Sequence, residues 1–257
     1  MLGGALGGLC IALVGLAGVA LIDTVTFLFV CTMLLLMRVP AQFRESDTFT
    51  VTSMLKRFVS EWLEGMSIIV HQRVLAVLFT MRALQGIGEG VFGVLLIVFV
   101  EKVLGYGSLV YGSLMSFQAV GSILGGFLLS WLGKRAIPTR IFGVCTVFFG
   151  LIDLAIIDIH MFIPGLFIVI VLFVLVGIPA TGMMVGFFSL LQSHTEDKLR
   201  GRVFGAYMTV EALMVLIGMS LAGALGDRLG SVLLLNIQGG VYTLSGVFVL
   251  VTLGAVL

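Results

Sequence analysis

The chain has 257 residues, of which 60% are hydrophobic and only 11% are charged, and its mean hydropathy is +1.25. Soluble domains carry roughly a quarter charged residues, so no water-soluble fold can bury this much apolar surface, and a soluble enzyme is excluded. The formal net charge of +1 offers no basic surface, so no nucleic-acid partner is expected. The sequence therefore predicts a protein whose solvent is the lipid bilayer.

Eight apolar stretches have the length of membrane-spanning helices, or nearly so. About 20 apolar residues cross the roughly 30 Å hydrocarbon core as a helix. The stretches are continuous and do not alternate at period two, which indicates helices and not barrel strands. We therefore predict an all-α, polytopic transmembrane helical bundle of about eight spans. They cover residues 1–15, 18–37, 74–100, 109–132, 139–157, 163–190, 203–225 and 232–255.

The first of these stretches is short. A helix over residues 1–15 is only about 22 Å long, less than the thickness of the hydrocarbon core. We expect a break between the first two spans at the glycines from Gly15 to Gly18. Because Met1 opens directly in apolar sequence, the chain is expected to begin inside a helix, as a fragment of a longer protein.

Basic residues gather on one side of the predicted bundle. Eleven of the fourteen lysines and arginines fall in the loops around residues 38–73, 133–140 and 192–202. Cytoplasmic loops carry the excess of lysine and arginine. These loops and both chain ends are therefore predicted to face the cytoplasm, in a plasma (inner) membrane, while the opposite loops hold Lys102 and Arg228.

The segment 38–73 is the one long polar stretch of the sequence. From Met54 to Ile69, apolar residues recur at helical spacing, and charged residues occupy the other face. This pattern predicts an amphipathic helix. We expect this helix to lie on the inner membrane surface. The alternative is that it only connects two bundles.

Two segments form a candidate inverted repeat. Residues 121–135 align with residues 218–232 at a constant offset of 97, with identities at Gly121/Gly218, Leu124/Leu221, Gly126/Gly223, Leu128/Leu225, Leu132/Leu229 and Gly133/Gly230. The offset corresponds to three spans, an odd number, so the two copies enter the membrane from opposite faces. Transporters that work by alternating access contain such repeats.

Four segments resemble signatures of the major facilitator superfamily. GALGDRLG (223–230) and a degraded copy, GFLLSWLGKR (126–135), are similar to its loop signature of Gly, three residues, Asp, a basic residue, one residue and Gly. DKLRGRVFG (197–205) resembles the entry to the eleventh span in the macrolide- and enterobactin-exporter-like branch. GGALGG (3–8) resembles the fifth-span antiporter signature, with Gly4 where proline is usual.

The resemblance covers the whole chain and implies two six-helix bundles around a central cavity. In a twelve-span scheme this chain would hold spans five to twelve. Residues 1–37 would be the last two spans of the N-terminal bundle, 38–73 the cytoplasmic linker with its amphipathic helix, and 74–257 the C-terminal six-span bundle. The missing N-terminal spans would be needed for a complete transporter, and no cofactor or metal is implied.

Two charged residues lie in the span predicted at 74–100. Arg82 and Glu89 are seven residues apart, on one face of a helix and about 10 Å from each other. A charge at the bilayer centre costs roughly 2.5–3.5 kcal/mol, so each is expected to have a partner on another helix or in a cavity. We interpret Glu89 as a proton-binding carboxylate. The alternatives are pairing with a basic group from the missing spans and solvation in an outer vestibule. Arg82 is interpreted as an anchor between bundles, or else as a substrate contact.

Four further polar residues of the predicted spans are candidate site residues. Glu211 is interpreted as a gate or salt-bridge residue with a transport carboxylate as the alternative, and Asp153 is a secondary candidate for proton coupling. Gln85 and Gln118 are candidates to line the cavity, although Gln118 equally suits a contact between helices.

The loop signature implies a conformational latch. In the family that the chain resembles, this signature holds helices together in one state of the transport cycle. The inner copy has Ser130 and Trp131 in place of the Asp and the basic residue, so an inner latch is expected to depend on basic residues nearby. The latch candidates are Gly126, Gly133, Lys134, Arg135, Arg200, Arg202, Asp227 and Arg228.

These observations favour a secondary transporter that exports amphipathic small molecules, of drug, macrolide or siderophore type, in exchange for protons. Two alternatives stay open at this point. One is an integral-membrane lipid- or prenyl-transferring enzyme, against which the scattered single charges argue, because such enzymes need clustered carboxylates or a nucleophile. The other is a truncated product without transport of its own.

Overall fold

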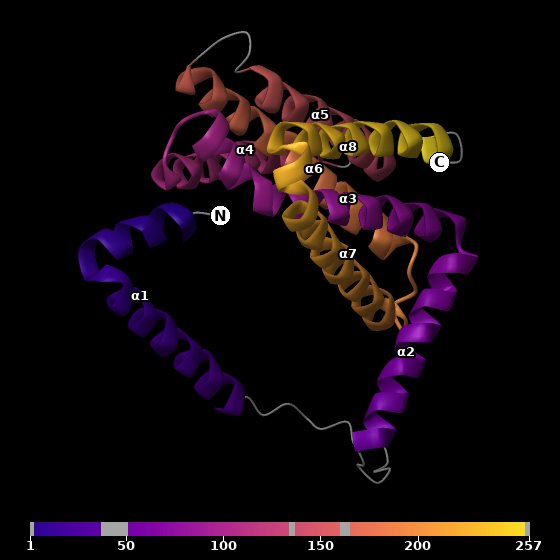
Figure 1. The fold of residues 1–257 in the computed structure, drawn as a ribbon. Coiled ribbons are helices and arrows are strands. Elements are labelled where there is room, and N and C mark those ends of the chain that lie inside the picture. Colours follow the sequence, from indigo (N-terminus) through magenta and orange to yellow (C-terminus); the bar gives the residue numbers. More distant parts are fainter. Residues whose placement is uncertain (1–2, 37–50, 134–136, 160–164, 255–257) are drawn as a thin grey trace. The chain divides into compact units, whose positions relative to one another are not determined.

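Helices account for nearly all of the chain that the structure, a computed structural model, describes: residues 3–36, 51–133, 137–159 and 165–254. Within these ranges the fold is all-helical, as predicted (Figure 1). A five-residue π-helical stretch, Phe99–Val103, extends α3. The helices are α1 (Gly3–Leu36), α2 (Val51–His71), α3 (Arg73–Val98), α4 (Ser108–Leu132), α5 (Pro138–Asp158), α6 (Leu166–Ser193), α7 (Arg200–Leu229) and α8 (Ser231–Gly254).

The chain divides into two compact units, Met1–Phe58 and Val59–Leu257. The first unit contains α1, a single helix of 34 residues. The prediction of two spans with a break at Gly15 to Gly18 is therefore wrong for this segment. The physical reason is that glycine weakens a helix by only about 1 kcal/mol, and without a proline the backbone hydrogen bonds continue through these glycines. Figure 1 shows that α1 bends partway along its length.

The second unit contains six helices that are long and apolar enough to cross a membrane. This number agrees with the six spans predicted between residues 74 and 257. The six run Arg73–Val103, Leu109–Leu132, Pro138–Asp158, Leu166–Ser193, Arg200–Leu229 and Ser231–Gly254. In the first unit, the described residues add a shorter apolar stretch, Ala20–Leu36.

Glycines allow the six helices to pack closely in pairs. The main contacts join α3 to α7, α4 to α6, and α5 to both α6 and α8. A methyl group at Gly218 of α7 would overlap the carbonyl oxygen of Ile87 in α3, and one at Gly121 of α4 would overlap that of Val174 in α6. Small residues at such crossings let backbones approach, which is how helices associate in lipid.

This packing fits the inverted repeat. The aligned segments lie on α4 and α7, and Gly121 and Gly218 are repeat equivalents. Both glycines are buried at a crossing between two helices. Gly121 of α4 lies against α6, and Gly218 of α7 lies against α3. Gly126 and Gly223 are also equivalent, and a methyl group at either would meet no other atom within 4 Å. The two copies therefore share both their tight and their open glycine positions.

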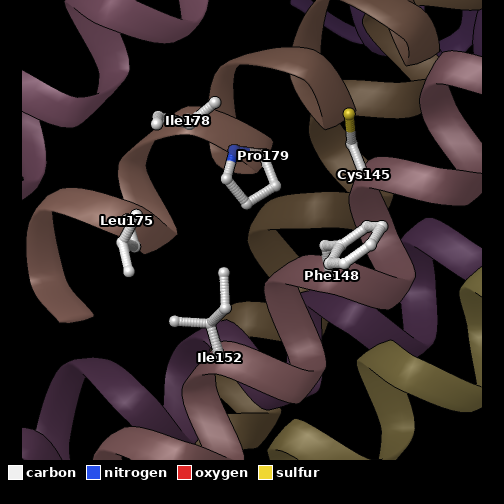
Figure 2. A pocket seen from close by; sticks show the side chains of 6 residues that line it. All are labelled: Cys145, Phe148, Ile152, Leu175, Ile178 and Pro179. Atoms are coloured by element: carbon white, nitrogen blue, oxygen red, sulfur yellow. The ribbon is translucent and has the colours of Figure 1, made fainter.

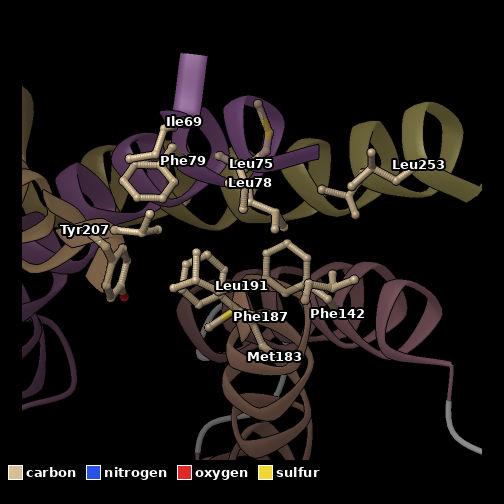
Figure 3. Packing of buried hydrophobic residues seen from close by; sticks show 14 of the residues in the cluster. Ile69, Leu75, Leu78, Phe79, Phe142, Met183, Phe187, Leu191, Tyr207 and Leu253 are labelled. Atoms are coloured by element: carbon tan, nitrogen blue, oxygen red, sulfur yellow. The ribbon is translucent and has the colours of Figure 1, made fainter. Parts of the chain in front are cut away.

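Two hydrophobic clusters occupy opposite ends of the six-helix unit. One brings together Leu75 near the start of α3, Leu191 near the end of α6 and Leu253 at the end of α8 (Figure 3). Val203, near the start of α7, belongs to the same cluster. The other joins the opposite ends of the same helices, for example Phe99 and Leu235. The helices therefore alternate in direction.

The prediction of an amphipathic helix in the segment 38–73 is confirmed by α2. From Val59 on, α2 belongs to the six-helix unit. Its Gly65 lies against the start of α7, where a methyl group would stand 2.8 Å from the carbonyl oxygen of Arg202. Trp62 and Ile69 pack with the first hydrophobic cluster. This half of α2 is thus a docked part of the bundle, and its place on the inner membrane surface stays a prediction.

Candidate functional site

An ion pair joins α3 to α7 within the membrane-spanning part of the bundle. The Arg82 guanidinium pairs with the Glu211 carboxylate, and the two side chains are only 13% and 26% exposed. Arg82 also donates to the hydroxyl of Tyr207 at 3.1 Å and to the amide oxygen of Gln85 at 3.3 Å. The carboxylate, the hydroxyl and the amide oxygen together accept several of the hydrogen bonds that the guanidinium can donate. These interactions offset part of the free-energy cost of burying its charge.

Aromatic rings surround the same guanidinium. Its central carbon lies 5.3 Å from the centroid of Phe187 on α6 and 6.0 Å from that of Tyr207. Tyr207 and Phe187 also contact each other, with ring centroids 4.9 Å apart. A guanidinium is weakly hydrated and stacks on aromatic faces, so these rings provide a favourable apolar setting for a cation.

Helical spacing explains how the sequence builds this site. Arg82 and Gln85 are three residues apart on α3, and Tyr207 and Glu211 are four apart on α7, so each pair shares one face of its helix. Gly86 makes the approach possible, because a methyl group there would stand 3.1 Å from Cβ of Met214. The glycine therefore sets the distance at which Arg82 can reach α7.

Glu89 differs from these residues because its side chain is exposed on the surface of the six-helix unit. It lies two turns along α3 from Arg82 and interacts electrostatically with both Arg82 and Glu211. When both glutamates are ionised, the group carries one positive and two negative charges. A single proton on either carboxylate makes the group neutral.

A second polar contact lies between α5 and α8. The amide nitrogen of Gln238 donates to Asp153 at 2.7 Å, and both side chains are buried. Further along, the amide nitrogen of Asn236 donates to Asp158 at 2.9 Å. The Tyr242 hydroxyl donates to the carbonyl oxygen of Gln85 at 3.2 Å and so connects α8 to α3.

The structure brings some of the predicted site residues together and leaves others apart. Arg82, Gln85 and Glu211 form one cluster, to which Glu89 is joined electrostatically. The recorded partners of Arg82 all lie within the six-helix unit, with Glu211 opposite it on α7. The interpretation of Arg82 as an anchor between bundles stays a prediction. Gln118 lies instead at the α4–α6 crossing, where its backbone carbonyl oxygen faces Gly177.

The latch candidates separate into three groups. Lys134 and Arg135 lie outside the described residues. Arg202 pairs with Glu64 of α2, and Arg200 pairs with Asp197 at 2.9 Å. The others lie at helix ends or in open positions: Gly126 is half-buried, Gly133 ends α4 with a positive φ of 51°, and Asp227 and Arg228 are exposed at the end of α7.

Several residues of the site were missed by the sequence reasoning. They are Tyr207, Phe187, Tyr242 and Gln238. The tyrosines carried a usable signal: the chain has only four, and three of them, including Tyr207 and Tyr242, lie in apolar spans, where a hydroxyl needs a partner. Phe187 carried none, because phenylalanine is common throughout these spans.

An apolar pocket of about 250 Å³ lies between α5 and α6, apart from the charged cluster (Figure 2). Pro179 cannot donate a backbone hydrogen bond, which locally weakens α6 at this point. Phe148 and Leu175 on the rim are 55% and 43% exposed, so the pocket opens on the outer surface of the bundle. Its lining consists of Cys145, Phe148, Ile152, Leu175, Ile178 and Pro179. Such a lining offers no ionic partner for a polar substrate group.

Comparison with known proteins identifies the family. The model described as Major Facilitator Superfamily matches the chain twice, over residues 1–219 and over residues 78–257. Together the two matches reach every helix of the structure. Comparisons with curated proteins and with solved structures give no significant match.

Proposed function

The chain belongs to the major facilitator superfamily, and from this premise we propose that it exports amphipathic small molecules in exchange for protons. The family consists of secondary transporters and not of enzymes, so the chain is a multi-pass membrane protein whose substrate is a transported small molecule. The alternative of a lipid- or prenyl-transferring enzyme is therefore set aside.

The excess carboxylate at the α3–α7 contact is the observation that carries the proposal. Glu89 and Glu211 share one cation, Arg82, so the ionised group has one negative charge more than positive. Uncompensated charge is costly at membrane depth. A proton removes the excess, and so does a positively charged group of a substrate. Protons and substrate would then compete for one carboxylate, which is the elementary step of exchange.

Glu89 is the better candidate for the exchanging carboxylate. Its side chain is exposed, whereas Glu211 is held by Arg82 in a contact that Tyr207 and Phe187 support. An exposed carboxylate can reach a substrate and water without breaking an ion pair. Apolar side chains exposed on the neighbouring helix, such as Met208 and Leu216, would accept the apolar part of an amphipathic substrate.

The remaining sequence predictions complete the proposed layout. Residues 74–257 are proposed as the C-terminal bundle, which the family match over 78–257 supports. The alternating helix directions place Arg73, Arg140 and Arg202 at one end of this bundle, which supports the proposed cytoplasmic side. The ion pair of Arg202 with Glu64 supports a latch at that side, whereas Asp227 and Arg228 stay latch candidates on the other.

Dye efflux from cells tests the function. The chain is expressed as it stands and within any longer reading frame that contains it, and efflux of a cationic dye is followed before and after a protonophore. We expect efflux that stops when the proton gradient collapses and that Glu89→Gln abolishes. Glu101→Gln, an exposed glutamate at the far end of the same span, is the matched control and should transport normally. Efflux that ignores both the protonophore and Glu89→Gln would overturn the proposal.

A further inference from the structure

Asp153 is a buried carboxylate that the α3–α7 site does not use. It lies inside the α5–α8 contact with an exposed fraction of 2%. Its recorded hydrogen-bond donor is the amide nitrogen of Gln238, at 2.7 Å from Oδ2. A carboxylate in this setting is either ionised and bound to a donor or protonated and itself a donor, and each state needs a different partner atom.

Gln238 has the two ends that these two states need. Its amide nitrogen faces Asp153, while its amide oxygen is buried and has no hydrogen-bond partner among the described residues. A half-turn of the amide would exchange the two ends. A buried acceptor without a partner costs about 1–3 kcal/mol, so the present orientation is retained because the nitrogen is needed at the carboxylate.

We propose that Asp153 is a second proton-binding site and that Gln238 inverts its amide when the proton binds. A hydronium ion transfers a proton to Oδ2: one O–H bond of hydronium breaks, an O–H bond forms on the carboxylate, and a water molecule is left. The new hydroxyl donates to the amide oxygen of Gln238, and the amide nitrogen turns away from Asp153. The side of Gln238 remote from Asp153 thereby changes from an acceptor to a donor.

The stem of the Gln238 side chain lies against α3. Its Cγ would stand 2.9 Å from a methyl group at Gly88, and the ring of Tyr242 would stand 3.2 Å from the same methyl group. One turn earlier on α3, Gln85 accepts from Arg82, and its own amide nitrogen is buried without a partner among the described residues. The proposed inversion therefore occurs in a side chain that packs against α3 one turn away from Gln85.

Other ionisable groups near Asp153 are few. Helix α5 packs against α6 and α8. Helix α6 carries no ionisable side chain from Leu166 to Ser193, and α8 presents Tyr242. Beyond α8, the groups within electrostatic reach of Tyr242 are Arg82 and Glu89 of α3 and Glu211 of α7, in addition to Asp153 itself. Tyr242 is thus within electrostatic reach of both Asp153 and the charged groups of the α3–α7 site.

The use of this second site in transport rests on the proposed proton exchange, but proton binding can be measured without transport. Infrared difference spectra of the purified full chain in proteoliposomes would be recorded across a pH titration. We expect a carbonyl band of a protonated carboxylic acid that grows as the pH falls, together with a shift of the glutamine side-chain carbonyl, identified by ¹³C-labelled glutamine.

Variants assign the carboxylic acid band and the glutamine carbonyl band to individual residues. Asp153→Asn should remove the carboxylic acid band. Asp158→Asn is the matched control, because Asp158 pairs with Asn236 between the same two helices but is only half-buried, and it should leave the band in place. Gln238→Met should keep the acid band at a changed frequency and remove the labelled shift.

The proton site, the amide inversion and the proposed function are each contradicted by a different outcome. If Asp153→Asn removes no pH-dependent acid band, the proton site is overturned. If the wild type shows the acid band but its labelled glutamine carbonyl band does not shift with pH, the proposed amide inversion is overturned. This outcome is read from the wild type alone, so it does not depend on whether Gln238→Met folds. If the wild type shows both bands but its dye efflux ignores the protonophore and Glu89→Gln, the proposed function alone is contradicted.

Discussion

Helices α4 and α6 meet in the same way as their repeat counterparts α7 and α3, yet the two contacts contain different chemistry. At the α4–α6 contact the Thr181 hydroxyl donates to the carbonyl oxygen of Ser122 at 2.8 Å. At the α3–α7 contact the ion pair of Arg82 with Glu211 takes the corresponding role. Both crossings have a buried glycine, Gly121 and Gly218, as the point of closest approach.

The difference shows what the repeat preserves. Close backbone approach is a requirement of packing in lipid and occurs in both copies. Charge is what the proposed proton exchange needs, and of these two contacts only the α3–α7 contact has it in the described residues. The duplicated architecture therefore has a neutral contact between α4 and α6 and an ion pair between α3 and α7.

Removal of Arg82 should have the largest effect on stability. Arg82→Leu leaves the carboxylate of Glu211 buried without its cation, and we expect a loss of about 3 kcal/mol in the free energy of unfolding. Denaturation in mixed detergent micelles would measure it. The charge-reversed double variant Arg82→Glu with Glu211→Arg should recover part of the loss. Equal stability of Arg82→Leu and the wild type would show that the ion pair does not hold α3 to α7.

Methyl groups at the two buried glycines should have the next largest effect, and an equal one. Gly121→Ala and Gly218→Ala each force a methyl group against a backbone carbonyl, and we expect each to cost about 2 kcal/mol by the same assay. Gly126→Ala and Gly223→Ala are the controls at the open equivalent positions and should be neutral or slightly stabilising. A large cost in one copy and none in the other would break the symmetry of packing.

Loss of the Thr181 hydroxyl should have a smaller effect. Thr181→Val removes one interhelical hydrogen bond and leaves the Ser122 carbonyl with its helical partner, so we expect a loss of about 1 kcal/mol. Thr80→Val on α3 is the control, because its hydroxyl bonds only to Ala76 of its own helix. If Thr181→Val were as harmful as Arg82→Leu, the α4–α6 contact would not be the simple scaffold described here.

The pair of Arg202 with Glu64 should contribute least to stability. The two side chains are 33% and 49% exposed, and such ion pairs are worth less than about 1 kcal/mol. Glu64→Gln should therefore change the free energy of unfolding little. If the pair is a latch, the same variant should instead change the rate of dye efflux, and unchanged rates would remove Arg202 from the latch candidates.

Much of the fold could be predicted from the sequence, because about 20 apolar residues in a row have few alternatives to a membrane-spanning helix. The six spans after residue 74 follow from this rule. The rule failed in α1, where Gly15 and Gly18 were interpreted as a break. Glycine stops helices in water largely by exposing the backbone to solvent, and apolar surroundings remove that competition.

The site could be predicted only in part. Arg82, Glu89 and Glu211 stand out because each is a charge in an apolar run. The pairing of Arg82 with Glu211, 129 residues further along the chain, depends on the register between α3 and α7, which no local pattern encodes. The same limit applies to Gln238, whose significance comes from Asp153 on another helix.

Proton release on substrate binding tests the central claim most directly. Purified protein in weakly buffered proteoliposomes would be mixed with a cationic amphipathic dye while a pH indicator follows the bulk solution. If Glu89 exchanges its proton for the substrate, the wild type should release close to one proton for each dye bound at a pH where Glu89 is almost fully protonated, and about half a proton where Glu89 is half protonated, because the two compete for one carboxylate. Glu89→Gln should bind the dye more weakly and release none. Equal proton release by the wild type and Glu89→Gln would contradict the account.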